Sequence, residues 1–371
     1  MHENKAGITV SVCMIVRDES PVLARCLDGV SVFADEIVIV DTGSIDDTRE
    51  IALRYTDRVY DFPWIDDFAA ARNVSFSYAS MDYVMWLDAD DVISYADAML
   101  IKELKHTLPG ETDMVFFLYG EERDQENIYN NSFVFRDRWF RRSLNPVWHG
   151  RLHEYVTMSK EAVKYYDDRI CIRHCKVRVN DPERNMRIHK LCMAEQTEPD
   201  ARNMGFLCNE YFSKGELENA VSMFDELTGQ EHFPAFDVKN ALSSYIFSMK
   251  SLKRNDELIC RLLSLQENGV VNEMLLTELG AAFLARKEYD EAEKYLKDAL
   301  ELPVDYRDMS VHFEAYHEFI PCQKLSKLYA VKGDMKTAYE YFKRAEKIYP
   351  ENKTIKLNRT YFNREKVTWE G

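Results

Sequence analysis

The stretch of sequence that decides the fold is residues 83–91, which read Y-V-M-W-L-D-A-D-D. A run of large apolar residues bounded by polar ones is typical of the central strand of an α/β sheet. The run ends abruptly in Asp88, Asp90 and Asp91, and ligands of such sheets bind at the carboxyl ends of the strands. Three neighbouring carboxylates repel one another unless a cation neutralises them, and hard oxygen ligands of this type suit Mg²⁺ or Mn²⁺. The alternative is an acidic turn that caps the next helix, because Asp is also a good N-cap.

Two earlier apolar stretches, residues 8–16 and 36–40, have the same character, and a helix-like stretch follows each of them. This alternation predicts an open α/β domain whose sheet is largely parallel. The polar side chains that follow these two strands include Arg17, Glu19, Asp41 and Ser44. On a parallel sheet they converge with the carboxylates of residues 88–91 and form a cleft along one edge. The chain has no G-x-G-x-x-G motif after its first strand and no G-x4-G-K-[ST] motif, which disfavours a dehydrogenase and a P-loop NTPase.

The overall composition is that of an acidic protein with two domains. Its 371 residues fit two domains of ordinary size, and a hydrophobic content of 46% is ample for packed cores. The formal net charge of −16 disfavours nucleic-acid binding through a basic surface. The N-terminus lacks the apolar core of a secretory signal, and no apolar run approaches the roughly 20 residues that span a bilayer. The eight cysteines form no dense framework, so we expect reduced thiols and a cytoplasmic location.

Four motifs follow one another in the first half of the chain: V-R-D-E, I-V-D-T-G-S-x-D-x-T, A-A-A-R-N and W-L-D-A-D-D. Their order resembles that of glycosyltransferase family 2, which has the Rossmann-like GT-A nucleotide-sugar fold. The resemblance covers residues 8–185 approximately. It identifies Asp88-Ala89-Asp90 as the D-x-D motif, and it implies that Asp88 contacts the ribose or the metal and that Asp90 is a direct metal ligand.

The same resemblance implies a nucleotide site on the earlier strands. Val16, Arg17 and Asp41 are expected to hold a uracil ring, and Arg72 is expected near the base and the phosphates. The alternative for Asp41 is a turn-forming residue, and the alternative for Arg72 is a surface salt bridge. Four further arginines could balance a diphosphate, and we expect at most one of Arg136, Arg138, Arg141 and Arg142 to touch a ligand.

Residues 148–154, which read W-H-G-R-L-H-E, are the second chemical landmark. Trp148 offers a face on which a sugar can stack, and the His-Glu sequence supplies a titratable pair. In the resembling enzymes an acidic pair stands here and its second member is the catalytic base, which assigns the base role to Glu154. Inverting sugar transfer needs such a carboxylate to take the acceptor proton. The alternatives for Glu154 are a helix cap or an ion pair with Arg151.

A later strand, residues 170–174, ends in His174. Some related GT-A enzymes place a histidine after the sheet as a further metal ligand, so the resemblance implies that Asp90 and His174 hold Mg²⁺ or Mn²⁺. His153 competes for this role, and a satisfied core histidine is the alternative for His174. The residues expected to bind the nucleotide sugar are Val16, Arg17, Glu19, Asp41, Ser44, Arg72, Asp88, Ala89 and Trp148.

Continuous amphipathic helices begin near residue 186, and repeats become visible there. A small residue is followed four positions later by a large apolar one, as in Ala220 and Phe224. The spacing resembles that of tetratricopeptide repeats, which stack into a scaffold with a concave binding face. Ala292 and Ala338 are separated by an insertion. We therefore expect a GT-A domain over residues 1–185 and an all-α tetratricopeptide-like domain over residues 186–371.

The combination of these two domains resembles bacterial glycosyltransferases that modify peptides and proteins, of the sublancin-type peptide S-/O-glycosyltransferase kind. It implies a metal-dependent, inverting transfer from a UDP-sugar such as UDP-glucose or UDP-GlcNAc to a Cys, Ser or Thr side chain, and a possible homodimer. One alternative acceptor is a cell-surface glycan or lipid-linked sugar. An alternative of another class is an inactive tetratricopeptide adaptor, which the presence of Asp88, Asp90 and Glu154 disfavours.

Overall fold

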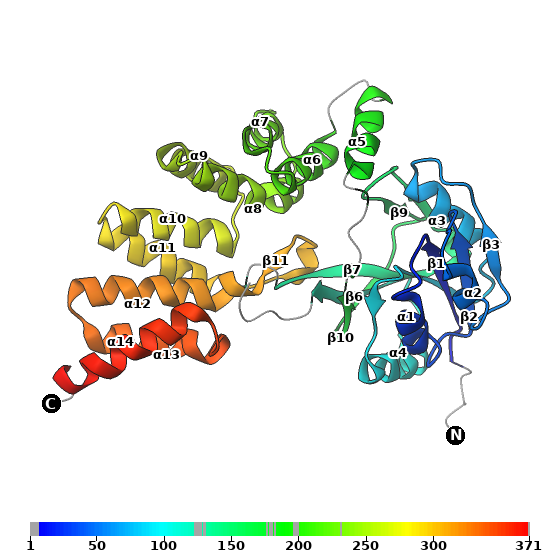
Figure 1. Ribbon diagram of the computed structural model, residues 1–371, viewed down its shortest axis with the longest axis horizontal. Helices are drawn as coiled ribbons and strands as arrows, with labels where there is room; N and C mark the ends of the chain where they lie inside the picture. The colour runs from blue at the N-terminus through cyan, green and yellow to red at the C-terminus, as the bar shows by residue number, and fades with distance from the viewer. Residues whose placement is uncertain are drawn as a thin grey trace. The chain divides into compact units, whose positions relative to one another are not determined.

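The computed structural model describes residues 7–121, 128, 131–175, 177, 181, 183–195, 200–230 and 232–369. The chain divides into two compact units, each built from two segments (Figure 1). The first unit comprises Met1–Glu122 and Val134–Glu198, and the second comprises Arg123–Phe133 and Pro199–Gly371. Two differences from the expected boundary at residue 185 follow. Helix α5 (Arg184–Glu195) belongs to the first unit, and a short early segment belongs to the second.

A mixed β-sheet is the centre of the first unit. Its strands are β1 (Val10–Val16), β2 (Glu36–Asp41), β3 (Val59–Asp61), β4 (Tyr83–Leu87), β5 (Asp91–Val92), β6 (Met114–Glu121), β7 (Ser132–Arg141) and β10 (Lys164–His174). Their order is β3-β2-β1-β4-β7-β6-β10-β5. The neighbours from β3 to β4 run parallel, as the sequence predicts. Beyond β4 the sheet is mixed, because β7 runs antiparallel to β4 and β5 runs antiparallel to β10.

Apolar side chains on both faces of the sheet explain why β1 and β4 read as continuous hydrophobic runs. In β4, Tyr83, Val84, Met85 and Leu87 are at most 1% exposed. The helices of this region are α1 (Leu23–Val30), α2 (Thr48–Ala52), α3 (Phe68–Ser77) and α4 (Tyr95–Thr107). Helix α3 packs on β1 and β2, and α4 packs on β10. A separate two-stranded sheet consists of β8 (Val147–His149) and β9 (Tyr155–Thr157).

The second unit consists of stacked helix pairs (Figure 1). Its helices are α6 (Ala201–Ser213), α7 (Leu217–Thr228), α8 (Ala235–Ser251), α9 (Asn255–Glu267), α10 (Glu273–Ala285), α11 (Tyr289–Glu301), α12 (Ile320–Lys332), α13 (Met335–Ile348) and α14 (Lys353–Trp369). The small residues of the repeats, Ala220, Ala292 and Ala338, are fully buried. They let the helices of a pair approach closely, which confirms the predicted helical repeats.

An insertion separates α11 from α12, as the spacing of the repeats predicts. It contains a 3₁₀ turn η3 (Tyr306–Asp308), the short strand β11 (His312–Phe313) and a π-helical turn η4 (Ala315–Phe319). Strand β11 pairs with residues 132 and 133, which belong to the same unit. The insertion therefore fastens the short early segment to the helical repeats.

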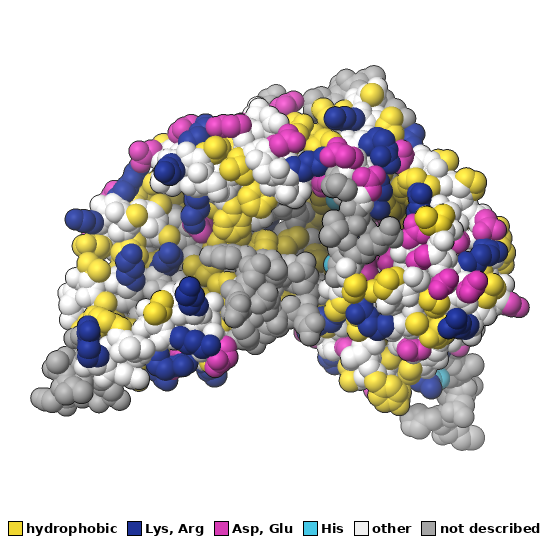
Figure 2. Space-filling model, in the orientation of Figure 1, with side chains coloured by type: hydrophobic (Ala, Val, Ile, Leu, Met, Phe, Trp, Pro, Cys, Tyr) yellow, Lys and Arg dark blue, Asp and Glu magenta, His cyan; other side chains and the backbone are white. Residues whose placement is uncertain are grey.

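The surface shows no single dominant charge in the view of Figure 2, where basic, acidic and hydrophobic side chains are interspersed over both units. Within the described ranges, no helix is both long and apolar enough to cross a bilayer. All eight cysteines are free thiols.

Candidate active site

Three carboxylates gather where β4 ends. The amide of Asp88 donates to Asp91 Oδ2 at 3.1 Å, and the amide of Asp91 donates to the carbonyl of Asp88 at 3.1 Å, so the chain turns tightly here. Asp91 then opens β5, which pairs with β10 so that His174 stands opposite Asp91. The histidine thus reaches the carboxylates through strand pairing, although it lies far away in the sequence.

This arrangement forms a compact cluster of possible metal ligands. Ligand atoms of Asp90, Asp91 and His174 all lie within 4.8 Å of one another. His174 Nδ1 is 3.4 Å from Asp90 Oδ1 and 3.8 Å from Asp91 Oδ1. Within the described ranges, His174 Nδ1 and Asp91 Oδ1 are buried and make no hydrogen bond. Because buried polar atoms are normally paired, this donor set fits a divalent cation.

The pKa shifts of the side chains in this cluster agree with a site for a divalent cation. The Asp91 carboxylate, together with Asp90, raises the pKa of His174 above its ordinary value. Burial raises the pKa of Asp90, and the neighbouring carboxylates add to this effect. A bound cation would relieve both the burial of the carboxylates and their mutual repulsion. The cluster contains the predicted ligands Asp90 and His174 and adds Asp91 to them.

Arg72 links the D-x-D motif to Glu154. Its Nη2 atom donates to Asp88 Oδ1 at 2.8 Å and its Nε atom donates to Glu154 Oε1 at 2.5 Å. The guanidinium also lies over the rings of Trp86 and Trp148, at 4.4 and 5.2 Å from their centroids. Burial opposes the charge of Arg72, but the two carboxylates raise its pKa, and Arg72 in turn lowers the pKa of Asp88. The alternative of a surface salt bridge does not hold, because Arg72 is only 5% exposed.

A second buried arginine, Arg138, balances Asp91. It is fully buried on β7, its Nη1 atom is 3.1 Å from Asp91 Oδ2, and its guanidinium lies 4.0 Å from the centroid of Trp86. Its Nε and Nη2 atoms make no hydrogen bond within the described residues. The sequence identifies Arg138 only as one of four arginines that could balance a diphosphate. The strand also contains Arg136, Asp137 and Arg141, so no local pattern distinguishes Arg138, and its ion pair with Asp91 comes from a distant part of the chain.

Residues expected to hold the nucleotide meet at the neighbouring strand ends. Val16 ends β1 opposite Asp41, the last residue of β2. Asp41 Oδ1 accepts the amides of Gly43 at 3.0 Å and Ser44 at 2.8 Å, and the Ser44 hydroxyl accepts the amide of Asp18 at 2.9 Å. Gly43 has a φ of +106°, which permits the turn.

The flanking positions differ in exposure. Arg17 is exposed, and the amide of Glu19 donates to the Thr48 hydroxyl at 2.6 Å. Ala89 is buried in the turn after β4, at 4% exposure. The hydrogen bonds from Asp18 to Ser44 and from Glu19 to Thr48 join the loops after β1 and β2. The predicted residues therefore share one edge of the sheet: Val16, Arg17, Glu19, Asp41 and Ser44.

The position of Trp148 differs from the expected sugar contact. Asn73 on α3 holds its backbone through two hydrogen bonds of 2.9 and 2.8 Å. The side chain is only 3% exposed and packs against Trp86 and Phe76, with ring centroids 5.5 and 5.6 Å away. Its rings are covered by protein, so Trp148 supports Arg72 and offers no open face for a sugar.

The histidines and arginine near Glu154 have partners of their own. Arg151 lies 3.6 Å from Asp67, so the ion pair of Glu154 is with Arg72 and not with Arg151. The ring of His153 lies 5.6 Å from that of His189 on α5. His174, and not His153, therefore joins the carboxylate cluster.

Comparison with known proteins agrees with this geometry. Residues 11–178 match the family model of glycosyl transferase family 2, and residues 321–352 match that of the tetratricopeptide repeat. The SPbeta prophage-derived glycosyltransferase SunS of Bacillus subtilis is 30% identical over 162 residues, which cover 41% of this chain and 36% of SunS. A TPR repeat-containing protein of Synechococcus elongatus is 36% identical over 157 residues, which cover 42% of this chain and 37% of that protein. The matched part thus spans little more than a third of the length of either relative.

A solved structure of glucosyl-3-phosphoglycerate synthase from Mycobacterium tuberculosis, in complex with Mn²⁺, UDP and glucosyl-3-phosphoglycerate, is also similar. It is 19% identical, covers 40% of this chain and 63% of that chain, and has a TM-score of 0.32. The family match and the strand-end cluster together support one conclusion. Residues 11–178 resemble a domain of glycosyltransferase family 2, and helical repeats follow it, of which residues 321–352 match the tetratricopeptide repeat.

Proposed function

We propose that this protein is a metal-dependent, inverting glycosyltransferase that moves a sugar from a UDP-type donor to a Cys, Ser or Thr side chain of a peptide or protein. The observation that carries the proposal is the meeting of Asp90, Asp91 and His174 at the end of β4, with Asp88 joined through Arg72 to Glu154. The family match of residues 11–178 supports the same reaction class.

On this proposal the donor lies along the carboxyl edge of β1, β2 and β4. Val16, Arg17 and Asp41 hold the base, and Asp88 holds the ribose. Asp90 and His174, with Asp91, would hold Mg²⁺ or Mn²⁺. When bound, this ion supplies positive charge to the diphosphate leaving group. Arg138 adds a fixed positive charge behind Asp91.

Glu154 is the proposed catalytic base. Arg72 occupies its Oε1 atom, and within the described ranges Oε2 has no such partner, so Oε2 is the atom that takes the acceptor proton. The acceptor oxygen or sulfur then attacks the anomeric carbon. The bond from that carbon to the diphosphate oxygen breaks, and its electron pair leaves with the nucleoside diphosphate. Attack on the face opposite the leaving group inverts the anomeric centre.

The acceptor is the least constrained part of the proposal. The name of SunS and the helical repeats after the transferase domain support a polypeptide acceptor over a glycan or lipid-linked sugar. The free thiols suit the cytoplasm, which we propose as the compartment. A homodimer belongs to the same proposal, and light scattering after size exclusion would detect it.

The deciding experiment incubates the full chain with UDP-glucose or UDP-GlcNAc, Mn²⁺ and candidate peptides, and reads intact mass. A mass gain of one hexose or one N-acetylhexosamine on a peptide is expected, and none with Asp90→Asn. Transfer to a glycan but not to peptides would reject the polypeptide acceptor. No donor turnover with any acceptor would favour an inactive adaptor.

A further inference from the structure

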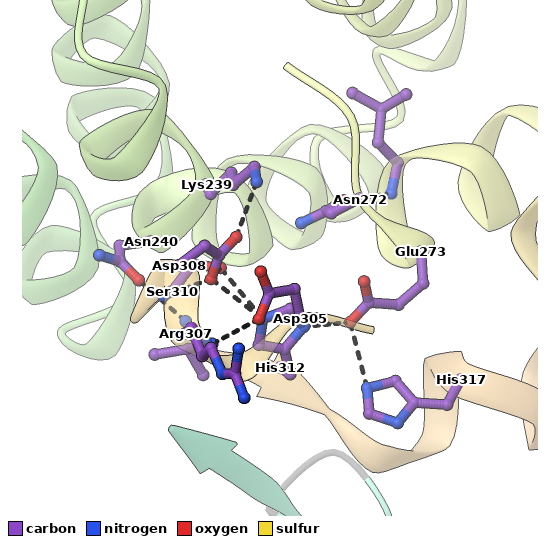
Figure 3. A network of polar contacts seen from close by, with 12 residues as sticks. Lys239, Asn240, Asn272, Glu273, Asp305, Arg307, Asp308, Ser310, His312 and His317 are labelled. Atoms are coloured by element: carbon purple, nitrogen blue, oxygen red, sulfur yellow. Dashed lines mark hydrogen bonds and ion pairs between the residues drawn. The ribbon is translucent and has the colours of Figure 1, made fainter. Parts of the chain in front are cut away.

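A second cluster of possible metal ligands lies in the helical unit, where the insertion after α11 meets the start of α10 (Figure 3). It consists of Glu273, the first residue of α10, His312 on β11 and His317 in the π-helical turn η4. We propose that these three side chains form a site for Zn²⁺. Two imidazoles and one carboxylate are a common ligand set for this ion.

The distances suit one small ion. Glu273 Oε1 lies 3.0 Å from His312 Nδ1 and 3.3 Å from His317 Nε2. Ligand atoms bound ~2.0–2.1 Å from a tetrahedral Zn²⁺ lie about 3.3–3.4 Å apart, so small side-chain shifts suffice. Glu273 and His312 are both 4% exposed, and the side chain of His317 is 18% exposed. The site is therefore largely buried, and its fourth position is open to water or another ligand.

Further partners orient both imidazoles. His312 Nε2 lies 3.2 Å from Asp308 Oδ1, and Lys239 binds the other oxygen of Asp308 at 2.8 Å. His317 Nδ1 lies 3.4 Å from the hydroxyl of Tyr306. Metal-binding histidines typically use their second nitrogen in this way, which fixes the ring and leaves the first nitrogen for the ion.

A structural ion pair is the competing explanation. Burial opposes protonation of His312, but hydrogen bonds to Asp308 and Glu273 raise its pKa to about 9. A protonated His312 would balance the charges of the Glu273 and Asp308 carboxylates without a metal ion. It would not account for His317, whose buried Nε2 atom faces Glu273 and makes no hydrogen bond within the described residues. The π-helical turn that holds His317 is also a rare conformation that occurs frequently at functional sites.

The test measures zinc bound to the full chain. The protein is stripped with EDTA, dialysed against Zn²⁺ and then against metal-free buffer, and analysed for zinc by mass spectrometry. The wild type should keep one zinc per chain that His317→Ala loses. His232→Ala, which removes an exposed histidine of the same unit, is the matched control and should keep it. Asp90→Ala should also keep it, which separates this site from the strand-end cluster.

Asp308→Asn should weaken zinc binding roughly 10- to 100-fold without abolishing it, as expected for an orienting partner. If His317→Ala fails to fold by circular dichroism, His317→Gln keeps most of the volume and replaces it. Equal zinc content in the wild type and the His317 variant would overturn the proposal. Equal loss in His232→Ala would overturn it too, because the ion would then be bound adventitiously at the surface.

Discussion

Replacing Arg72 by methionine tests whether the link between the D-x-D motif and Glu154 is structural as well as catalytic. The side chain of Glu154 is 12% exposed, so losing its charged hydrogen bond should cost about 1.5–3 kcal/mol. That of Asp88 is 36% exposed, and its pair should contribute at most about 1 kcal/mol because solvent screens it. The cation–π contact with Trp86 adds about 0.5–2 kcal/mol. The total loss of about 2–6 kcal/mol agrees with the ~3–5 kcal/mol typical of breaking a buried ion pair.

Urea unfolding followed by tryptophan fluorescence is the assay, because Trp86 and Trp148 flank the guanidinium. Arg49→Met is the control, since Arg49 pairs with Asp61 at an exposed site and should cost less than about 1 kcal/mol. Adding Glu154→Gln to Arg72→Met should recover part of the loss, because it removes the unpaired carboxylate. If Arg72→Met lowers the free energy of unfolding by no more than Arg49→Met does, the ion pairs of Arg72 do not stabilise the fold and the reasoning fails.

Three further predictions concern the active site and its surroundings. Chelation by EDTA should abolish donor turnover, and Mn²⁺ or Mg²⁺ should restore it in the wild type but not in Asp90→Ala; full turnover in EDTA would contradict the metal site. Glu154→Gln should lower kcat by roughly 10²- to 10⁴-fold on a hydroxyl acceptor, with less loss on a thiol, whereas donor affinity measured by calorimetry should change little. Burial opposes the ionisation of Asp46, but hydrogen bonds from Thr48 and Ser20 lower its pKa to about 2. Its stabilising effect, at most about 2.5 kcal/mol, is therefore present above about pH 4 and is lost as pH falls towards 2. The stability difference between wild type and Asp46→Asn should shrink over that range, and a constant difference would refute the assignment.

Local sequence patterns account for much of the fold. The apolar run before Asp88 predicts a buried strand with acids at its end. The alternation of such runs with helix-like stretches predicts the α/β sheet. The small residues Ala220 and Ala338 likewise predict tight helix pairs, because only small side chains fit there. Such features depend on neighbours within a few residues.

The remaining features depend on contacts between distant residues. The pairing of Asp91 with His174 comes from β5 and β10, and no local pattern fixes that register. Trp148 looked suited to a sugar because tryptophan often stacks on one, but Asn73 and Trp86 bury it. The assignment of residues 131–133 to the helical unit depends on β11, which lies much later in the chain.

That last contact has a consequence for how the protein is made. The side-chain Nδ2 atom of Asn131 donates to the hydroxyl of Tyr349 at 2.9 Å, across 218 positions of sequence. A ribosome adds about 5–20 residues per second, so Asn131 emerges about 10–45 s before its partner exists. During that interval residues 131–133 also lack β11, and a chaperone could bind them while β7 joins the sheet. The helical unit, to which residues 131–133 belong, is therefore complete only when Tyr349 at the end of α13 has left the ribosome.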